Sequence, residues 1–159
     1  MTAITTRSAT AADTAEALAV VRESITQSCV ADHQHDPPTL ERWLRNKTPE
    51  HFARWCSDPD TQIVVAELDG AIAGVAALHR SGQIHLFYVR PAHVRLGVGR
   101  ALLLAIEAQA LALHIPTLTL ESTLCARRFY RQNGFEAAGD PTPQFGVLRG
   151  YPHRKVLAR

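Results

Sequence analysis

Two apolar segments in the middle of the chain, 61–68 and 71–78, are joined by Asp69-Gly70. Short segments of apolar and β-branched residues bounded by turn residues are typical of strands. Asp-Gly favours the two-residue turn of a hairpin. A third apolar segment, 83–89, follows the turn residues Ser81-Gly82. The pattern therefore predicts a hairpin and a third strand after it.

A spacing of three to four residues between apolar positions predicts the helices. Leu18, Val21 and Ile25 follow this spacing, and Thr10 or Asp13 is suited to cap their helix. Because one side of such a helix is apolar, it is expected to pack against a sheet. Further helices are expected at 40–45, 49–56, 98–113 and 124–132.

The remaining short segments complete the predicted fold. Strands are expected at 4–7, 117–121, 135–138 and 151–157, and irregular segments at 32–38 and 141–144. Strands and helices in this order predict a single α/β domain over residues 1–159, with a mixed sheet flanked by helices. The connection through the helix at 98–113 is expected to cross over with a right hand.

Composition excludes several classes of protein. A chain of 159 residues, 46% hydrophobic and 20% charged, is large and apolar enough to fold around a core. Its apolar runs are shorter than the roughly 18 residues of a membrane-spanning helix, and its first residues lack the apolar core of a secretory signal. A net charge of +2 does not favour a nucleic-acid partner. Cys29, Cys56 and Cys125 show no paired spacing, which predicts a reduced protein of the cytoplasm.

Two glycines mark the start of the helix at 98–113. Gly97 and Gly99 follow the strand that ends at Val89, and Arg95 and Arg100 lie beside them. The first N–H groups of a helix have no internal partner, and glycine lets a ligand approach the backbone closely. This arrangement predicts a site for a phosphate or pyrophosphate. The dinucleotide-binding fingerprint is not met, because it requires a third glycine where Leu102 stands.

A second motif lies about thirty residues downstream. Ala126-x-x-Phe129-Tyr130 precedes Gly134-Phe135, so that a short helix ends at a glycine before a strand. With Gly97-x-Gly99 after Tyr88-Val89-x-Pro91, the chain resembles the GNAT superfamily of acyl-coenzyme A-dependent N-acetyltransferases over residues 61–139. It departs from the family pattern at two positions. Val94 stands where the family commonly has Gln or Arg, and Thr123 where it often has Asn.

The resemblance implies a binding site for coenzyme A. In the family, two parallel strands of a mixed, mostly antiparallel sheet splay apart, and the pantetheine arm pairs with the first of them in the gap. The helix-opening loop binds the pyrophosphate through main-chain N–H groups. Carried over to this chain, the cofactor-binding residues are Tyr88, Val89, Arg95, Leu96, Gly97, Val98, Gly99, Arg100, Thr123 and Ala126.

The same resemblance suggests catalytic roles. Tyr130 matches the family's general acid, which donates a proton to the leaving thiolate, and the N–H of Val89 is the candidate donor to the oxyanion. The general base is left open between Glu121, His85 and a chain of water molecules, with His79 as a weaker candidate. Strand alternation is expected to put His85 on the same side as Phe87 and Val89.

The implied function is transfer of the acetyl group of acetyl-coenzyme A directly to a primary amine of a small molecule, without a metal. A protein or peptide amino group is an alternative acceptor, and a catalytically silent coenzyme A sensor is the alternative from another class. No nucleic acid or membrane is expected as a partner, and a homodimer is left open. Asp32, His33, His35 and Asp36 are expected near the acceptor amine.

Two features near Tyr130 have two interpretations each. Arg127 and Arg128 either reach the phosphates of the coenzyme or form a solvated helix face. Cys125, near the start of the helix, either has a lowered pKa or is a buried structural thiol, and the second interpretation is adopted.

Overall fold

The first sheet of the protein has the strand order β1-β2-β3-β4, and all its neighbours are antiparallel. The computed structural model describes residues 3–157. Asp69 and Gly70 both have positive φ, as the predicted hairpin turn requires. The four strands are β1 (Ile4–Ser8), β2 (Thr61–Leu68), β3 (Ala71–His79) and β4 (Ile84–Val89).

The second sheet has the order β5-β8-β6, and β7 pairs with the N-terminal part of β8. Residues 141–144, predicted as a loop, lie largely in β7, and β8 begins at Leu148 rather than at Tyr151. The two prolines of this segment indicated a loop, but an edge strand accepts proline where its N–H has no partner. The strands are β5 (Thr117–Ser122), β6 (Glu136–Ala137), β7 (Thr142–Phe145) and β8 (Leu148–Val156).

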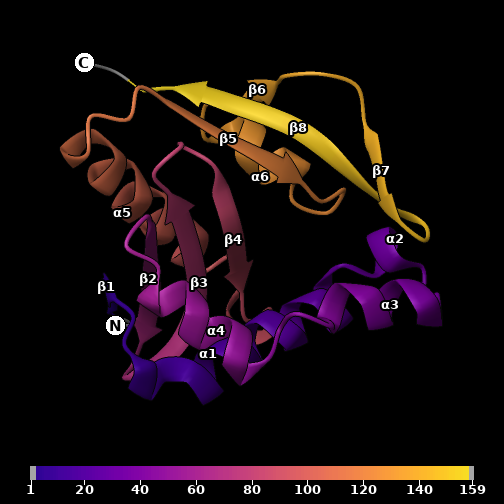
Figure 1. Cartoon of the computed structure of the whole chain (residues 1–159), viewed down its shortest axis with the longest axis horizontal. Coiled ribbons are helices and arrows are strands. Elements are labelled where there is room, and N and C mark those ends of the chain that lie inside the picture. Colours follow the sequence, from indigo (N-terminus) through magenta and orange to yellow (C-terminus); the bar gives the residue numbers. More distant parts are fainter. Residues whose placement is uncertain (1–2, 158–159) are drawn as a thin grey trace.

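The two sheets meet between β4 and β5, which run parallel. An isolated parallel bridge joins Gln83 to Thr119, and the N–H of Thr119 donates to the carbonyl of Gly82 at 2.9 Å. Beyond this bridge the two strands diverge (Figure 1). The predicted mixed, mostly antiparallel fold with a splayed parallel pair is therefore confirmed.

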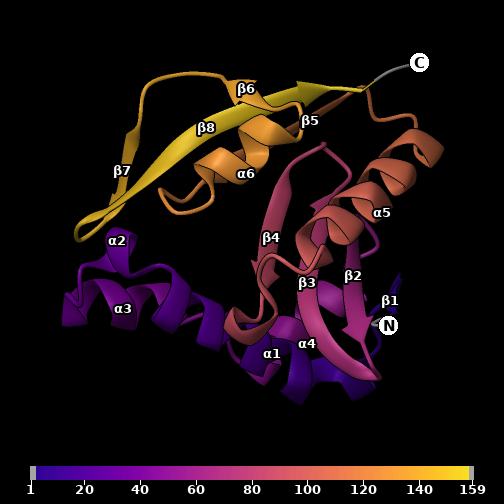
Figure 2. The ribbon, with the colours of Figure 1, turned by 180° about the vertical axis from the view of Figure 1, so that it is seen from behind.

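Helices cover both faces of the first sheet. One core lies between this sheet and α5 (Val98–Ala112) and continues to Tyr130 of α6 (Arg127–Gln132). The other lies against α1 (Thr14–Glu23) and α4 (Pro49–Ser57). Figures 1 and 2 show α5 on one side of the strands and α1 and α4 on the other. Trp43 and Phe52 are buried in the second core.

The helix after β1 changes its geometry at its C-terminal end. After Glu23, α1 passes into a π-helical turn, η2 (Ser24–Ser28). Short 3₁₀ turns lie elsewhere, at Ala11–Asp13 (η1) and Pro91–His93 (η3). The turn η2 is followed by α2 (Val30–His33) and α3 (Pro37–Leu44), so that helix enters the segment predicted to be irregular. The π-helical turn has consequences for the site, because insertions of this kind reorient the residues that follow them.

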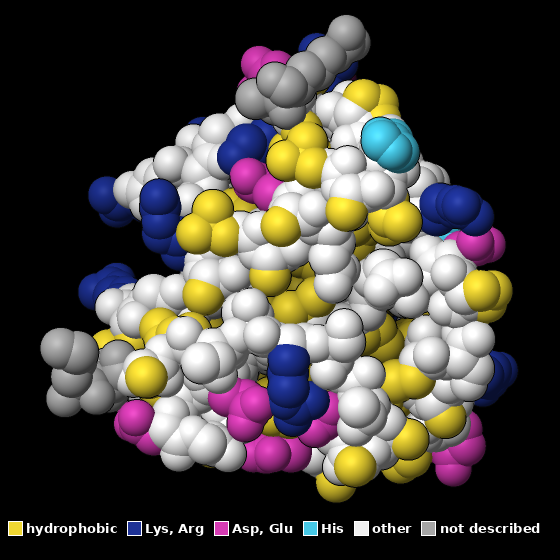
Figure 3. Space-filling model, turned by 90° about the vertical axis from the view of Figure 1, so that its left-hand side faces the viewer, with side chains coloured by type: hydrophobic (Ala, Val, Ile, Leu, Met, Phe, Trp, Pro, Cys, Tyr) yellow, Lys and Arg dark blue, Asp and Glu magenta, His cyan; other side chains and the backbone are white. Residues whose placement is uncertain are grey.

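The side of the molecule that carries α5 is partly apolar. Leu104, Leu111 and Leu113 are exposed. Seen from the left-hand side of Figure 1, hydrophobic side chains are spread among uncharged ones over the middle of this face, and a basic side chain bordered by acidic ones lies below them (Figure 3). Among the helices of residues 3–157, none combines the length and hydropathy needed to cross a membrane.

Candidate active site

A cavity of about 980 Å³ lies where β4 and β5 diverge. One wall comes from β4 and the start of α5, and the opposite wall from the end of β5 and α6. A third contribution comes from η2 and the residue after it. The lining residues include Ser24, Ser28, Cys29, His85, Phe87, Tyr88, Val89, Arg95, Gly97, Gly99, Arg100, Glu121, Thr123, Cys125, Ala126, Arg128, Phe129 and Tyr130.

The structure brings Tyr130, the candidate bases Glu121 and His85, and most of the predicted cofactor-binding residues to this one cavity. The exceptions among the cofactor-binding residues are two members of the glycine loop. The side chain of Leu96 is 49% exposed, and that of Val98 is buried in the core at 1%. Their predicted contribution was through the main chain, so the position of their side chains does not test it. The cofactor and catalytic roles of the lining residues stay predictions.

The loop before α5 presents unpaired backbone donors. Arg95 and Gly97 have φ values of +64° and +91°, and Gly97 is the N-cap of α5. The N–H of Ala101 makes the first helical bond, to the carbonyl of Gly97 at 3.0 Å. The N–H groups of the three residues before Ala101 therefore have no helical acceptor. Left-handed residues followed by a helix start form a concave set of donors suited to an anion.

Position 99 requires glycine because a side chain there would collide with its neighbours, and not because of an unusual φ. A Cβ atom at this position would lie 3.1 Å from Cε1 of Phe129, which projects from α6. Such a contact is tighter than side chains normally accept. Gly99 therefore lets α5 and α6 approach each other at the mouth of the cavity.

Tyr130 lies in a cluster of aromatic rings. Its ring meets those of Phe129 and Phe135 edge to face at 5.4 Å and that of Phe87 at 5.7 Å. The residue is 5% exposed but borders the cavity. Burial raises the pKa of the Tyr130 phenol well above its ordinary value. The hydroxyl therefore stays protonated at neutral pH and is available as a donor.

A second tyrosine faces the same cavity. The indole N–H of Trp43 donates to the Tyr88 hydroxyl at 3.3 Å. Burial raises the pKa of Tyr88 as well. No local pattern indicates this bond, because Trp43 and Tyr88 are 45 positions apart. It fixes the side chain of Tyr88 against the second core.

The two candidate bases lie on opposite strands. Glu121 is exposed at the end of β5, and a Cβ on Gly150 would come within 2.6 Å of its Oε2, so the missing side chain leaves room for the carboxylate. His85 lies on β4. Partial removal from water, together with the nearby His79 ring at 5.4 Å, lowers the pKa of His85.

The alternation predicted for His85 is interrupted. Ile84 pairs with Leu78 and Leu86 with Ala77, so that His85 is the additional residue of a β-bulge. Ile84 consequently packs into the first core and Leu86 into the second, although they are two positions apart. A bulge turns the side chains around it. His85 lines the cavity through this bulge and not through regular alternation.

The polar segment around residue 33 holds the structure together and does not line the cavity. Asp32 is buried and accepts the N–H groups of Leu124 at 2.6 Å and of Cys125 at 3.3 Å. His33 is fully buried and contacts the Thr26 carbonyl at 3.1 Å. The expectation that these two residues meet the acceptor amine is therefore wrong. α6 begins at 127 and not at 124 as predicted, and residues 124–126 form a turn whose first two N–H groups donate to Asp32.

Two cysteines meet beside this segment. The Sγ atoms of Cys29 and Cys125 are 3.5 Å apart, and the Thr123 hydroxyl lies 3.3 Å from the sulfur of Cys125. Cys125 is exposed, so the interpretation as a buried structural thiol is wrong. The bond with Cys29, aided by Thr123, lowers the pKa of Cys125. The same bond, aided by burial, raises the pKa of Cys29.

The same place offers ligand atoms of a type that metals bind. Potential ligand atoms of Cys29, Asp32 and Cys125 lie within 4.8 Å of one another. Both oxygens of Asp32 already accept N–H groups. A reaction without a metal stays a prediction.

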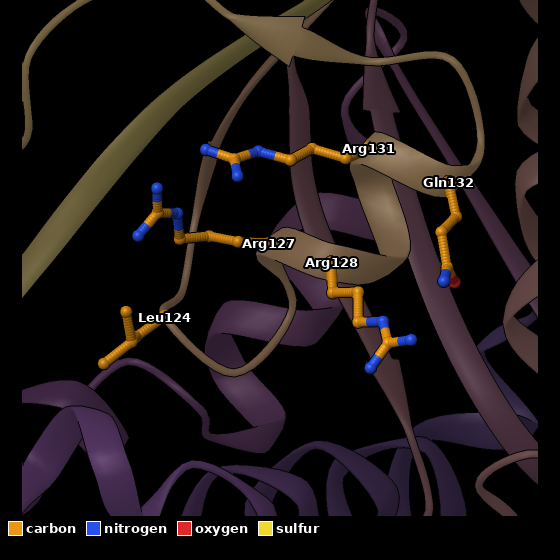
Figure 4. Close-up of a pocket in the computed structure, with 5 residues that line it drawn as sticks. All are labelled: Leu124, Arg127, Arg128, Arg131 and Gln132. Carbon is orange, nitrogen blue, oxygen red and sulfur yellow. The ribbon is translucent and has the colours of Figure 1, made fainter.

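The arginines of α6 divide between two sides of the helix. Arg127 and Arg131 extend to the side that also carries Leu124, and Arg128 points away from them (Figure 4). The guanidinium of Arg127 lies 4.6 Å above the ring of Tyr151. Of the two arginines considered for phosphate binding, Arg128 lines the large cavity, whereas Arg127 borders a neighbouring pocket of about 610 Å³.

The comparisons with known proteins agree with this geometry. The family described as Acetyltransferase (GNAT) domain matches residues 21–157. A GCN5-related N-acetyltransferase from Rhodopseudomonas palustris has 26% identity and a TM-score of 0.85, over 96% of this chain and 95% of that one. No curated protein sequence matches significantly.

More distant structures share the fold. The PaiA N-acetyltransferase of Thermoplasma acidophilum, solved with coenzyme A, has 20% identity and a TM-score of 0.81, over 98% of this chain and 99% of that one. The ribosomal-protein-S18-alanine N-acetyltransferase of Escherichia coli has 17% identity and a TM-score of 0.69, over 99% and 96%. With a family match over most of its length, this chain belongs to the GNAT family of acetyltransferases.

Proposed function

We propose that the protein transfers the acetyl group of acetyl-coenzyme A directly to a primary amine of a small molecule. The observation that carries this proposal is a single cavity that extends from the unpaired N–H groups at the start of α5 to Tyr130. Both substrates can occupy it together, so transfer needs no covalent enzyme intermediate and, as proposed, no metal. We also propose that residues 1–159 act as one domain in the cytoplasm.

The donor side of the cavity fits the parts of coenzyme A. The pyrophosphate would bind the unpaired N–H groups at the start of α5, with Arg95, Arg100 and Arg128 supplying positive charge. Beyond the bridge at Gln83, the edge of β4 that faces β5 is not paired with it. The amides of the pantetheine arm would pair with this edge as an added strand does.

The transfer step then requires three groups of the protein. A base removes a proton from the ammonium so that the neutral amine can attack the thioester carbonyl. The N–H of Val89 stabilises the oxyanion of the tetrahedral intermediate. When the carbon–sulfur bond breaks, the Tyr130 hydroxyl donates its proton to the leaving thiolate, and solvent returns a proton to the phenolate.

The shape around the cavity favours a small acceptor. The N–H of Val147, at the tip of the β7–β8 hairpin, donates to Oγ1 of Thr39 at 3.0 Å, and Arg42 lies 5.1 Å from the centre of the Phe145 ring. The tip of the β7–β8 hairpin thus contacts α3 (Figure 1). We infer that this contact limits the room for a folded protein surface beside the cavity. The name of the E. coli neighbour keeps a protein acceptor as the alternative.

A turnover assay tests the proposal. The protein is incubated with acetyl-coenzyme A and a panel of small primary amines and peptides, and free thiol is measured. We expect release of thiol with at least one small amine and none with the peptides. Turnover with peptides alone would support the protein-acceptor alternative. Coenzyme A binding without turnover on any amine would support the silent sensor.

The pH profile discriminates between the two bases. His85 must be neutral to accept a proton, and its lowered pKa keeps it neutral to below the ordinary value of about 6.5. If His85 is the base, kcat/KM falls only as the pH drops below about 6.5, and His85→Gln lowers the rate and removes that decline. Glu121→Gln serves as the matched variant and should keep the decline. Loss of the decline in Glu121→Gln alone would assign the base to Glu121.

A further inference from the structure

Two cysteine thiols from distant segments meet at the wall of the cavity. Cys29 follows η2, and Cys125 lies in the loop between β5 and α6, 96 positions later. Their sulfurs are 3.5 Å apart, and both residues line the cavity that holds Tyr130. The proposed reaction uses neither thiol. The third cysteine, Cys56, lies in α4 among the residues of the second core and does not line this cavity.

The backbone around the pair is already held in place. Asp32, three residues after Cys29, accepts the N–H groups of Leu124 and Cys125 itself. A disulfide has an S–S distance of about 2.05 Å, so the sulfurs must approach by about 1.5 Å. With both segments joined by the Asp32 carboxylate, rotation of the side chains supplies much of this movement.

The two thiols differ in exposure and in pKa, as the attacking and the second thiol of a reactive pair do. Cys125 is exposed, and the hydrogen bonds that its sulfur shares with Cys29 and Thr123 lower its pKa, so its thiolate can meet a dissolved oxidant. Cys29 is 3% exposed, and its sulfur lies 3.5 Å from that of Cys125. An attacking thiol at the surface and a second thiol behind it can form a disulfide in two exchange steps.

We propose that Cys29 and Cys125 form a reversible disulfide that links two walls of the cavity and thereby lowers acetyl transfer. The oxidant is a small disulfide such as oxidised glutathione. The Cys125 thiolate attacks one of its sulfurs, which releases one thiolate and leaves a mixed disulfide. Cys29 then loses its proton to solvent and attacks the Cys125 sulfur, which releases the second thiolate. The protein loses two electrons and two protons, and two molecules of small thiol are formed.

The effect on catalysis rests on the proposed function. The link would fix η2, which contributes Ser24 and Ser28 to the cavity, to the loop that carries Thr123 and leads to Tyr130. The Asp32 hydrogen bonds alone allow these walls to separate when the acceptor enters, whereas the covalent link would prevent it. Reduction by a dithiol reverses the link.

The experiment compares the wild type with Cys29→Ser, Cys125→Ser and the matched control Cys56→Ser. Each protein is incubated with oxidised glutathione, and its intact mass and its turnover relative to its own reduced form are measured. The wild type and Cys56→Ser should lose the mass of two hydrogen atoms and most of their turnover, and dithiothreitol should restore both. Cys29→Ser should stop at one added glutathione on Cys125, and Cys125→Ser should gain none at Cys29.

Several results would overturn the proposal. One is a wild type that accumulates only the mixed disulfide, and another is a link that involves Cys56. A third is an oxidised wild type that keeps the turnover of its reduced form. A fourth is a purified protein that holds one Zn²⁺ through both cysteines and resists oxidation until the metal is chelated. Mass is measured without an acceptor, and affinity for acetyl-coenzyme A is compared before and after oxidation. Disulfide formation with changed affinity but no turnover on any amine would count against the proposed function and not against the link.

Discussion

Tyr130→Phe is expected to lower kcat by about 10²–10⁴-fold, the usual contribution of a general acid, with little change in the KM for acetyl-coenzyme A. The hydroxyl is needed while the carbon–sulfur bond breaks and makes no equal contribution before it. The ring itself stays, so the contacts with Phe87, Phe129 and Phe135 are kept. Steady-state kinetics under conditions where chemistry limits turnover measure the effect.

Tyr151→Phe is the matched control. Tyr151 is a partly exposed residue of β8 that lies under Arg127, and it does not line the cavity. Loss of its hydroxyl should leave kcat unchanged. If Tyr130→Phe retained nearly full turnover, or lost activity only in proportion to lost thermal stability, Tyr130 would be a packing residue and the acid would have to be sought elsewhere.

The backbone of the loop before α5 and of the β2–β3 turn could be predicted because its signals are local. Gly97 and Gly99 precede a helix within a few residues, and Asp69-Gly70 determines its own turn. Such features depend on backbone geometry that glycine permits and other residues resist. The strands on either side were long and apolar enough to be recognised. The divergence of β4 and β5 was implied only by the resemblance to the GNAT superfamily.

The acceptor side could not be predicted because its contacts join residues far apart in sequence. Asp32 and Leu124 are 92 positions apart, and no local pattern distinguishes a carboxylate that will accept a distant N–H from one that faces solvent. The π-helical turn that brings Ser24 and Ser28 to the cavity is not marked by any characteristic residue pattern. β7 was missed for a related reason, since pairing with β8 outweighs the loop preference of its one proline, Pro143.

Gly99→Val is expected to weaken the binding of coenzyme A by about 10–100-fold, which corresponds to the usual cost of forcing extra atoms into a filled space. The new side chain would begin 3.1 Å from the Phe129 ring, at the mouth of the cavity and one residue from the first unpaired N–H of α5. Either the ring moves into the cavity or the start of α5 moves away from the pyrophosphate. Isothermal titration with coenzyme A measures the change in Kd.

Ala108→Val separates this steric effect from the lower helix propensity of valine, since Ala108 is an exposed residue of the same helix, outside the cavity. It should bind coenzyme A as the wild type does. Circular dichroism establishes that both variants are folded before titration. An unchanged Kd in a folded Gly99→Val protein would show that the coenzyme does not approach the start of α5. The pyrophosphate would then need another cation-rich surface, for which Arg127 and Arg131, side by side on α6 (Figure 4), are the next residues to replace.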